Sequence, residues 1–218
     1  MTVSEIKIDA KMVKELRDMT MAPMGDCKKA LEEAKGNIEE AVVVLRKRGM
    51  ASAAKKAARS TNEGAIGTYI HAGGKIGVLL ELNCESDFVA RTEDFSDLMK
   101  DIAMHIAASD PRYVKPEDVT PEDLEREKEI YRAQAAATGK PAPVIEKIVD
   151  GKMAKFYEEV CLLEQPFIKE QSVSIKELIA QKVGKLGENI TIRRFARFKD
   201  GAPDWTVAQT KAVEAATE

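Results

Sequence analysis

Apolar positions recur at helical spacing through residues 8–48 and divide that region into three short helices. Asp9 is suited to cap the first helix, and Pro23 to occupy the first position of the second. Gly36 ends the second helix, and Asn37 can cap the third. Three helices of this length make a minimal bundle, which is marginal alone and adequate with a partner.

Alternating apolar residues then predict a β-hairpin over residues 63–83, with Gly73 and Gly74 supplying the positive φ angles of its turn. A second region of alternation, residues 189–198, predicts a third strand. Neither face of that strand is purely apolar at its C-terminal end. This pattern indicates either an edge strand or a sheet packed on both sides.

Helical periodicity returns in the stretches that separate these strands. The predicted helices cover residues 92–106, 121–138, 144–164 and 174–187. The second is highly charged and is expected to pack thinly, and the third is expected to be interrupted near Asp150-Gly151. These two can pair as an antiparallel helical hairpin, while the last is expected to end near Gly187.

The order of the predicted elements indicates an α+β protein, because the helices and strands do not alternate as in a βαβ fold. A three-stranded antiparallel sheet, packed by helices and accompanied by the helical hairpin, would form the core. We predict a helical head over residues 1–50, a basic linker over 51–62, the α+β core over 63–199, and a C-terminal tail over 200–218. The tail has no clear apolar stripe and is expected to be mobile.

The composition fits a folded protein and limits its partners. Of the 218 residues, 44% are hydrophobic and only 5% aromatic, which favours helices over a β-sandwich. The net charge of −3 excludes a strongly cationic nucleic-acid binder but leaves a local basic patch possible. No apolar run is long enough to span a membrane and no leader is evident, so we expect a cytoplasmic protein without a membrane partner.

Side chains that could perform chemistry are scattered rather than clustered. Cys27, Cys84 and Cys161 lack the spacing of a zinc site, and we interpret them as free thiols in a reducing compartment. His71 and His105 have no nucleophile or metal partner nearby in sequence, so a structural role is favoured for both. Phosphate-loop, dinucleotide and H-E-x-x-H motifs are absent. We therefore expect a binding or regulatory protein that is not an enzyme and uses no cofactor or metal.

Positive charge gathers in the linker and at the helix end before it. The basic residues concerned are Lys47, Arg48, Lys55, Lys56 and Arg59. They could bind RNA or the ribosome, which would make the protein an RNA-associated module. They could equally form a solvated connector, which is the more common role of such a segment.

An acidic residue and an aromatic residue lie side by side where the predicted hairpin ends and the next helix begins. Asp87 and Phe88 follow Ser86 there, and Val89 comes next. Such turns lie on the surface and are held by rigid elements on both sides. Phe88 could project into a partner protein as a wedge. Alternatively, Ser86 or Asp87 caps a helical turn and Phe88 fills a local gap.

Three parts of the chain, each made of one or more short stretches, resemble the bacterial elongation factor Ts family in its short form. They are residues 13–17, 26–31 and 36–41 of the head, residues 63–71 and 83–90 of the hairpin and corner, and residues 161–167. The resemblance runs from about Ile8 to Phe198. It departs from the family at Ser86, where Thr is usual, and at 21–23, where the family usually has Gly.

The resemblance implies a function for these segments. It implies a head resembling a ubiquitin-associated (UBA) domain that docks on the GTPase elongation factor Tu, and a core that meets the more distant domains of that GTPase. It assigns Ser86, Asp87, Phe88 and Val89 to a wedge that disturbs the Mg²⁺ and nucleotide site and so exchanges GDP for GTP. The head residues implied in partner binding are Val13, Leu16, Arg17, Met24, Asp26 and Lys28. No direct contact with nucleic acid is expected, and an unpaired sheet edge or face leaves a homodimer possible.

Overall fold

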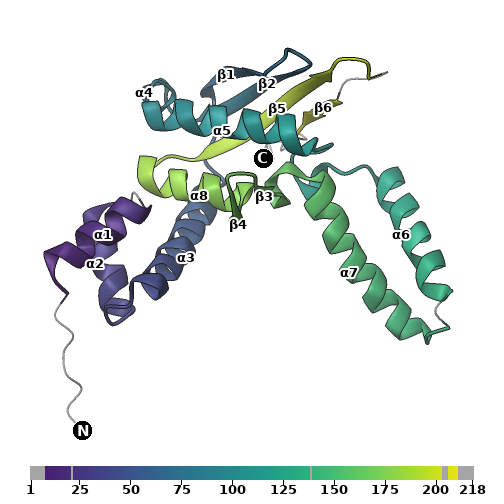
Figure 1. Ribbon diagram of the computed structural model, residues 1–218, viewed down its shortest axis with the longest axis horizontal. Helices are drawn as coiled ribbons and strands as arrows, with labels where there is room; N and C mark the ends of the chain where they lie inside the picture. The colour runs from purple at the N-terminus through teal and green to yellow at the C-terminus, as the bar shows by residue number, and fades with distance from the viewer. Residues whose placement is uncertain (1–7, 21, 138, 203–205, 211–218) are drawn as a thin grey trace, which may run out of the picture. The chain divides into compact units, whose positions relative to one another are not determined.

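The computed structural model describes residues 8–20, 22–137, 139–202 and 206–210 (Figure 1). Its α-helices are α1 (Ala10–Thr20), α2 (Met24–Glu33), α3 (Ile38–Lys56), α4 (Asp87–Ala90), α5 (Glu93–Ser109), α6 (Pro121–Ala136), α7 (Ala142–Val160) and α8 (Ile175–Leu186). Its strands are β1 (Glu63–Ile70), β2 (Ile76–Cys84), β3 (Pro166–Phe167), β4 (Glu170–Ser174), β5 (Ile190–Lys199) and β6 (Thr206–Gln209). Short 3₁₀ turns lie at Pro116–Asp118 and Leu162–Glu164. The mixture of helices with antiparallel strands fits the predicted α+β class.

The chain forms two compact units, and their limits differ from the division that we drew along the sequence. The first unit joins residues 1–64 to 83–98 and 177–191, and the second joins 65–82, 99–176 and 192–218. The division into a head, linker, core and tail stays a prediction. The first unit shows that the head and linker group with α4, the start of α5 and α8, all of which come from the stretch that we assigned to the core.

Within the first unit, α1, α2 and α3 enclose a small core of their own. Its buried members are Val13, Leu16, Cys27, Ala30, Leu31, Ala34 and Ala41. The predicted caps form at both sites: the Met12 N–H donates to Asp9 at 2.8 Å, and the Glu40 N–H donates to Asn37 at 3.1 Å. Pro23 precedes α2 as its cap residue rather than occupying its first position.

The third helix continues past the predicted end of the head. α3 runs to Lys56, so the first six residues of the predicted linker 51–62 are helical. Within this helix, Gly49 passes close to the backbone of Ala180 and Gly184 on α8. A Cβ at Gly49 would lie 3.7 Å from the Ala180 carbonyl oxygen.

The main sheet has four strands in the order β1-β2-β5-β6, and it lies largely in the second unit. The prediction of three strands is therefore wrong, because residues 206–209 of the tail pair antiparallel with β5, Phe195 opposite Ala208. The mobility of the tail stays a prediction, and residues 203–205 and 211–218 lie outside the described residues. β5 is consequently an inner strand, which excludes the edge-strand alternative. A four-residue strand is too short to give a clear alternation in the sequence.

The predicted helical hairpin is present in the second unit. α6 and α7 lie side by side, and the short connection between them makes them antiparallel (Figure 1). Thr120 caps α6 by accepting from the Asp123 N–H at 3.2 Å. The expected break near Asp150-Gly151 is wrong, because α7 is continuous from Ala142 to Val160 and Gly151 does not adopt a positive φ. The predicted C-terminal end of α6, at Thr138, lies outside the described residues.

His105 is fully buried in the second unit, and both of its ring nitrogens have partners. The Ile168 N–H donates to Nδ1 at 3.3 Å, so Nδ1 is an acceptor and Nε2 carries the proton. Nε2 then donates to the Gln165 side-chain oxygen at 2.9 Å. Burial lowers the pKa of His105, although its bond to Gln165 opposes this. The predicted structural role of this histidine agrees with this environment.

A histidine that is neutral when buried makes stability depend on pH. Because its folded pKa lies below the unfolded value, the unfolded chain binds the proton first as pH falls. We expect the free energy of unfolding to fall below pH ~6.5, by at most about 1.4 kcal/mol per pH unit from this group. Urea unfolding at pH 7.5 and 5.5 should show a smaller pH effect in His105→Gln than in the parent. An equal pH effect in His105→Gln and in the parent protein would contradict the assignment.

Candidate partner-binding site

The site predicted from the sequence is a single helical turn, α4, that directly follows β2. Ser86 begins it as an extended N-cap residue (φ −131°, ψ 154°), and its hydroxyl accepts from the Val89 N–H at 3.4 Å. Thr92 closes the other end, since its hydroxyl donates to the Val89 carbonyl at 2.8 Å and accepts from the Phe95 N–H at 3.3 Å. A turn this short is fixed by hydrogen bonds at both ends rather than by its own length.

The side chains of this turn point in opposite directions. Val89 is 5% exposed and anchors the turn in the first unit, whereas Phe88 is 77% exposed. No other residue among the large exposed hydrophobic side chains of the described chain is as accessible. Of the two interpretations of Phe88, the gap filler is therefore excluded, and capping by Ser86 coexists with an outward ring. An exposed Phe on a fixed turn is suited to enter a hollow in another molecule.

Asp87 is the charged member of the turn. It is exposed and forms an ion pair with Arg91, one helical turn later, at 2.8 Å. Because both side chains are accessible to water, this pair stabilises the fold little and can open to meet a partner. The Asp87 carboxylate also lies in the first turn of α4, where a negative charge is favourable.

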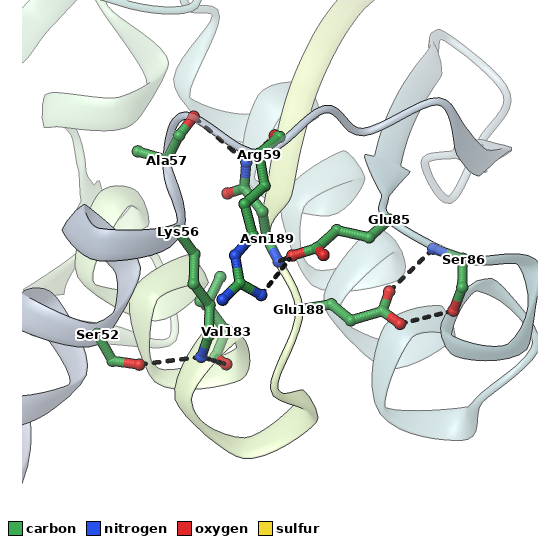
Figure 2. A network of polar contacts seen from close by, with 9 residues as sticks. All are labelled: Ser52, Lys56, Ala57, Arg59, Glu85, Ser86, Val183, Glu188 and Asn189. Carbon is green, nitrogen blue, oxygen red and sulfur yellow. Dashed lines mark hydrogen bonds and ion pairs between the residues drawn. The ribbon is translucent and has the colours of Figure 1, made fainter.

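The corner is held from behind by residues about one hundred positions later in the chain. The Glu188 carboxylate accepts from the Ser86 hydroxyl at 2.6 Å and from the Ser86 N–H at 3.0 Å (Figure 2). The Glu85 carboxylate accepts in turn from the Asn189 N–H at 2.6 Å. Nothing in the local sequence marks Glu188 or Asn189 as part of the site, because only the fold brings them to Ser86.

The linker is fastened to the same place. The Asn189 side chain, which is 4% exposed, donates to the carbonyl oxygens of Arg59 at 2.9 Å and Ala57 at 3.4 Å (Figure 2). Arg59 also forms an ion pair with Glu85 at 3.4 Å. The chain leaving α3 is thus joined by specific bonds to the segment that carries α4.

The head residues assigned to partner binding divide into two groups. Arg17, Met24, Asp26 and Lys28 are exposed, Met24 by 50%. Val13 and Leu16 are buried in the head core, so in this structure they shape the bundle and offer no direct contact surface. Their assignment as contact residues, which rested on the family resemblance, stays a prediction, and their burial counts against a direct contact.

Several of the basic residues of the alternative RNA site have partners within the protein. Arg48 pairs with Glu33 at 2.7 Å, and Lys56 donates to Ser52 at 3.0 Å and to the Val183 carbonyl at 3.5 Å (Figure 2). Arg59 is engaged by Glu85, as described above. Lys47 and Lys55 are exposed. Arg48 and Arg59 are therefore paired with carboxylates, which weakens the case for a continuous basic surface.

The described residues offer few other sites for chemistry. Across residues 8–20, 22–137, 139–202 and 206–210, no group of acidic, Cys and His side chains is placed to hold a metal ion. All three cysteines are buried free thiols, and burial raises the pKa of each, that of Cys161 to about 12. In the same part of the chain, no helix combines the length and apolar character that a membrane crossing requires.

Comparison with known proteins identifies the family of this chain. The model of the family described as "Elongation factor TS" matches residues 2–201. The elongation factor Ts of Koribacter versatilis is 72% identical over 207 residues, which cover 95% of this chain and 94% of that protein. The chain belongs to the elongation factor Ts family.

Other members of the family agree over most of their length. The elongation factor Ts of Solibacter usitatus is 58% identical over 195 residues, covering 89% of this chain and 92% of that protein. That of Carboxydothermus hydrogenoformans is 57% identical over 194 residues, covering 89% of each. The resemblance seen in the three sequence segments is confirmed, and it places the chain among the translation elongation factors of protein synthesis. The family match includes the head and α4 but ends before β6.

Proposed function

We propose that this protein binds elongation factor Tu in its GDP form and promotes the exchange of GDP for GTP. In this role it acts as an exchange factor and makes or breaks no covalent bond. Membership of the elongation factor Ts family supports the partner and the process. The single observation that carries the mechanism is the outward Phe88 ring, 77% exposed on a turn that is anchored by Ser86 and Val89.

The proposed mechanism is displacement of groups around the partner's metal ion. Phe88 and Asp87 enter between helices of the GTPase close to its bound Mg²⁺ and nucleotide. Mg²⁺ requires near-ideal octahedral coordination, so a small displacement of its ligands weakens the hold on GDP. A rigid turn suits this task, because a flexible Phe would yield to the partner instead of moving it.

Binding of the factor and binding of GDP then oppose each other with one coupling free energy. The factor lowers the affinity of the GTPase for GDP by the same factor by which GDP lowers its affinity for the exchange factor. After GDP leaves, the more abundant GTP refills the site and releases the factor. Asp87 can leave its ion pair with Arg91 and contact a group on the partner instead. Because this contact forms only in the complex, it contributes to the coupling free energy.

The head provides the second part of the proposed interface. We propose that its three helices adopt a UBA-like arrangement and dock on the nucleotide domain of the partner through Arg17, Met24, Asp26 and Lys28, which are exposed. Val13 and Leu16 act behind this surface by fixing the positions of α1 and α2. A homodimer remains a further proposal, which sedimentation of the free protein tests.

Release of fluorescent GDP from elongation factor Tu tests the proposed function directly. We expect release to accelerate with the concentration of this protein and to reach a limiting rate at least roughly tenfold above the spontaneous rate, equivalent to about 1.4 kcal/mol of barrier. Excess unlabelled GDP should compete with the factor for the GTPase. Absence of acceleration at a saturating concentration would refute the proposal.

An RNA-binding role remains the competing hypothesis from another functional class. It predicts association with ribosomal RNA that weakens steeply as salt is raised. The ion pairs of Arg48 and Arg59 with Glu33 and Glu85 count against it. Salt-dependent RNA binding without any effect on GDP release would favour this alternative.

A further inference from the structure

Glu188 is the residue that joins the exposed turn to a distant part of the chain. It follows Gly187, which ends α8 with a positive φ of 82°, a conformation that favours glycine. The sharp ending of α8 directs Glu188 at the corner, where its two carboxylate oxygens hold one residue. One oxygen accepts a hydrogen bond from the Ser86 hydroxyl at 2.6 Å, and the other accepts one from the Ser86 N–H at 3.0 Å.

Bonds of this kind fix both the position and the orientation of the residue that they hold. Hydrogen bonds to an ionised carboxylate are shorter and stronger than neutral ones. Because Glu188 holds the hydroxyl and the backbone of Ser86 together, it sets the direction in which α4 starts. Ser86 is the N-cap of α4, and Phe88 is only two residues further on.

The contact is reciprocal, so neither segment can shift along the other without breaking hydrogen bonds. Glu188 accepts from the backbone of Ser86, while Glu85 accepts from the backbone of Asn189 at 2.6 Å. Two neighbouring residues of each segment therefore grip two neighbouring residues of the other (Figure 2). We call the four residues Glu85, Ser86, Glu188 and Asn189 the corner clasp.

The helix that precedes Glu188, α8, is itself fixed within the first unit. Asp94, in the first turn of α5, accepts from Lys182 at 2.8 Å and from Lys185 at 2.7 Å, both on α8. These hydrogen bonds lower the pKa of Asp94, so its carboxylate stays charged. Glu188 consequently lies two residues beyond an anchored helix, which limits the movement of the corner.

We propose that Glu188 is a positioning residue for nucleotide exchange: through the corner clasp it holds Ser86 so that Phe88 stays directed outward and resists the partner. This inference rests on the proposed function. Glu188 lies behind the turn and acts through Ser86, so it affects the limiting rate of GDP release and leaves most of the affinity unchanged. It is not itself a contact with the nucleotide site.

Glu188→Ala tests this role, with Glu188→Gln as the conservative variant. The alanine removes both acceptors, whereas the glutamine keeps one acceptor oxygen and loses the charge. We expect the limiting rate of fluorescent GDP release to fall about tenfold in Glu188→Ala and by a smaller factor in Glu188→Gln. Glu129→Ala, which removes an exposed carboxylate from α6, is the charge-matched control and should behave as the parent.

A double-mutant cycle distinguishes positioning from a general structural effect. If Glu188 acts through Phe88, Glu188→Ala should cause no further loss of rate in a Phe88→Ala background. Equal losses in both backgrounds would overturn the inference, as would a normal rate in Glu188→Ala alone. Circular dichroism at the assay temperature checks that each variant is folded.

Hydrogen exchange of the Ser86 amide gives a readout that does not need the GTPase. Loss of its acceptor should accelerate exchange at Ser86 about tenfold in Glu188→Ala, with no change in Glu129→Ala. Unchanged exchange would show that Glu188 does not hold the corner. If the parent protein fails to accelerate GDP release, the proposed function and the role of Glu188 in exchange both fail, whereas the amide still reports on the clasp itself.

Discussion

Phe88→Ala should reduce the limiting rate of GDP release from elongation factor Tu by roughly 30-fold, equivalent to about 2 kcal/mol. The ring is 77% exposed, and alanine in its place cannot displace groups around the partner's metal ion. The concentration of factor that gives half of the limiting rate should change much less, because the head and the rest of the surface still bind. Stopped-flow measurement of fluorescent GDP release over a range of factor concentrations separates these two quantities.

The same substitution should leave the free energy of unfolding nearly unchanged, since a mostly exposed side chain contributes little to the core. Ile130→Ala is the matched control, because Ile130 is also a large exposed hydrophobic residue, 42% accessible, but lies on α6. The control should exchange nucleotide at the rate of the parent protein. An unchanged limiting rate in Phe88→Ala would remove Phe88 from the mechanism.

Leu31→Ala should have the largest effect on the head, with a loss of about 2–5 kcal/mol in its local stability. Leu31 is completely buried in α2, where it packs in the small core shared with α1 and α3. A bundle of this size is only marginally stable. A cavity in its core should therefore unfold the head locally while the rest of the first unit stays folded. We expect faster hydrogen exchange through residues 10–45.

The functional consequence of Leu31→Ala should differ from that of Phe88→Ala. Loss of the docking surface raises the factor concentration needed for half of the limiting rate by at least tenfold, whereas the limiting rate itself falls less. Leu31→Met nearly conserves the volume and should cost less than about 1.5 kcal/mol, so it serves as the control. A normal half-saturation concentration in a variant with an open head would refute the docking role.

Prediction from the sequence succeeded where structure depends on residues near one another in the chain. Asp9 and Asn37 cap the helices that were expected to follow them. The corner was also recognisable, since Ser86 precedes Asp87 and Phe88 at a strand-to-helix change. Each of these features is decided within about four residues, which is the range of a capping hydrogen bond.

Prediction was less successful where local pattern is ambiguous. The family resemblance assigned Val13 and Leu16 to the partner surface, yet both side chains are buried in the head core. Residues 206–209 were expected to be mobile, but their backbone groups pair with β5. A strand of four residues has no periodicity of its own to recognise, so its partner determines its structure.

The sequence by itself determined the family, the helices with their caps, and the position of the Ser86–Val89 turn, because these follow from contiguous residues. Only the tertiary structure decided that Phe88 points outward and Val89 inward, and that Glu188 and Asn189 hold the corner from behind. Direction and support of a side chain depend on contacts between residues that are about one hundred positions apart. Such contacts arise only when the fold brings their backbones together, and no local pattern records them.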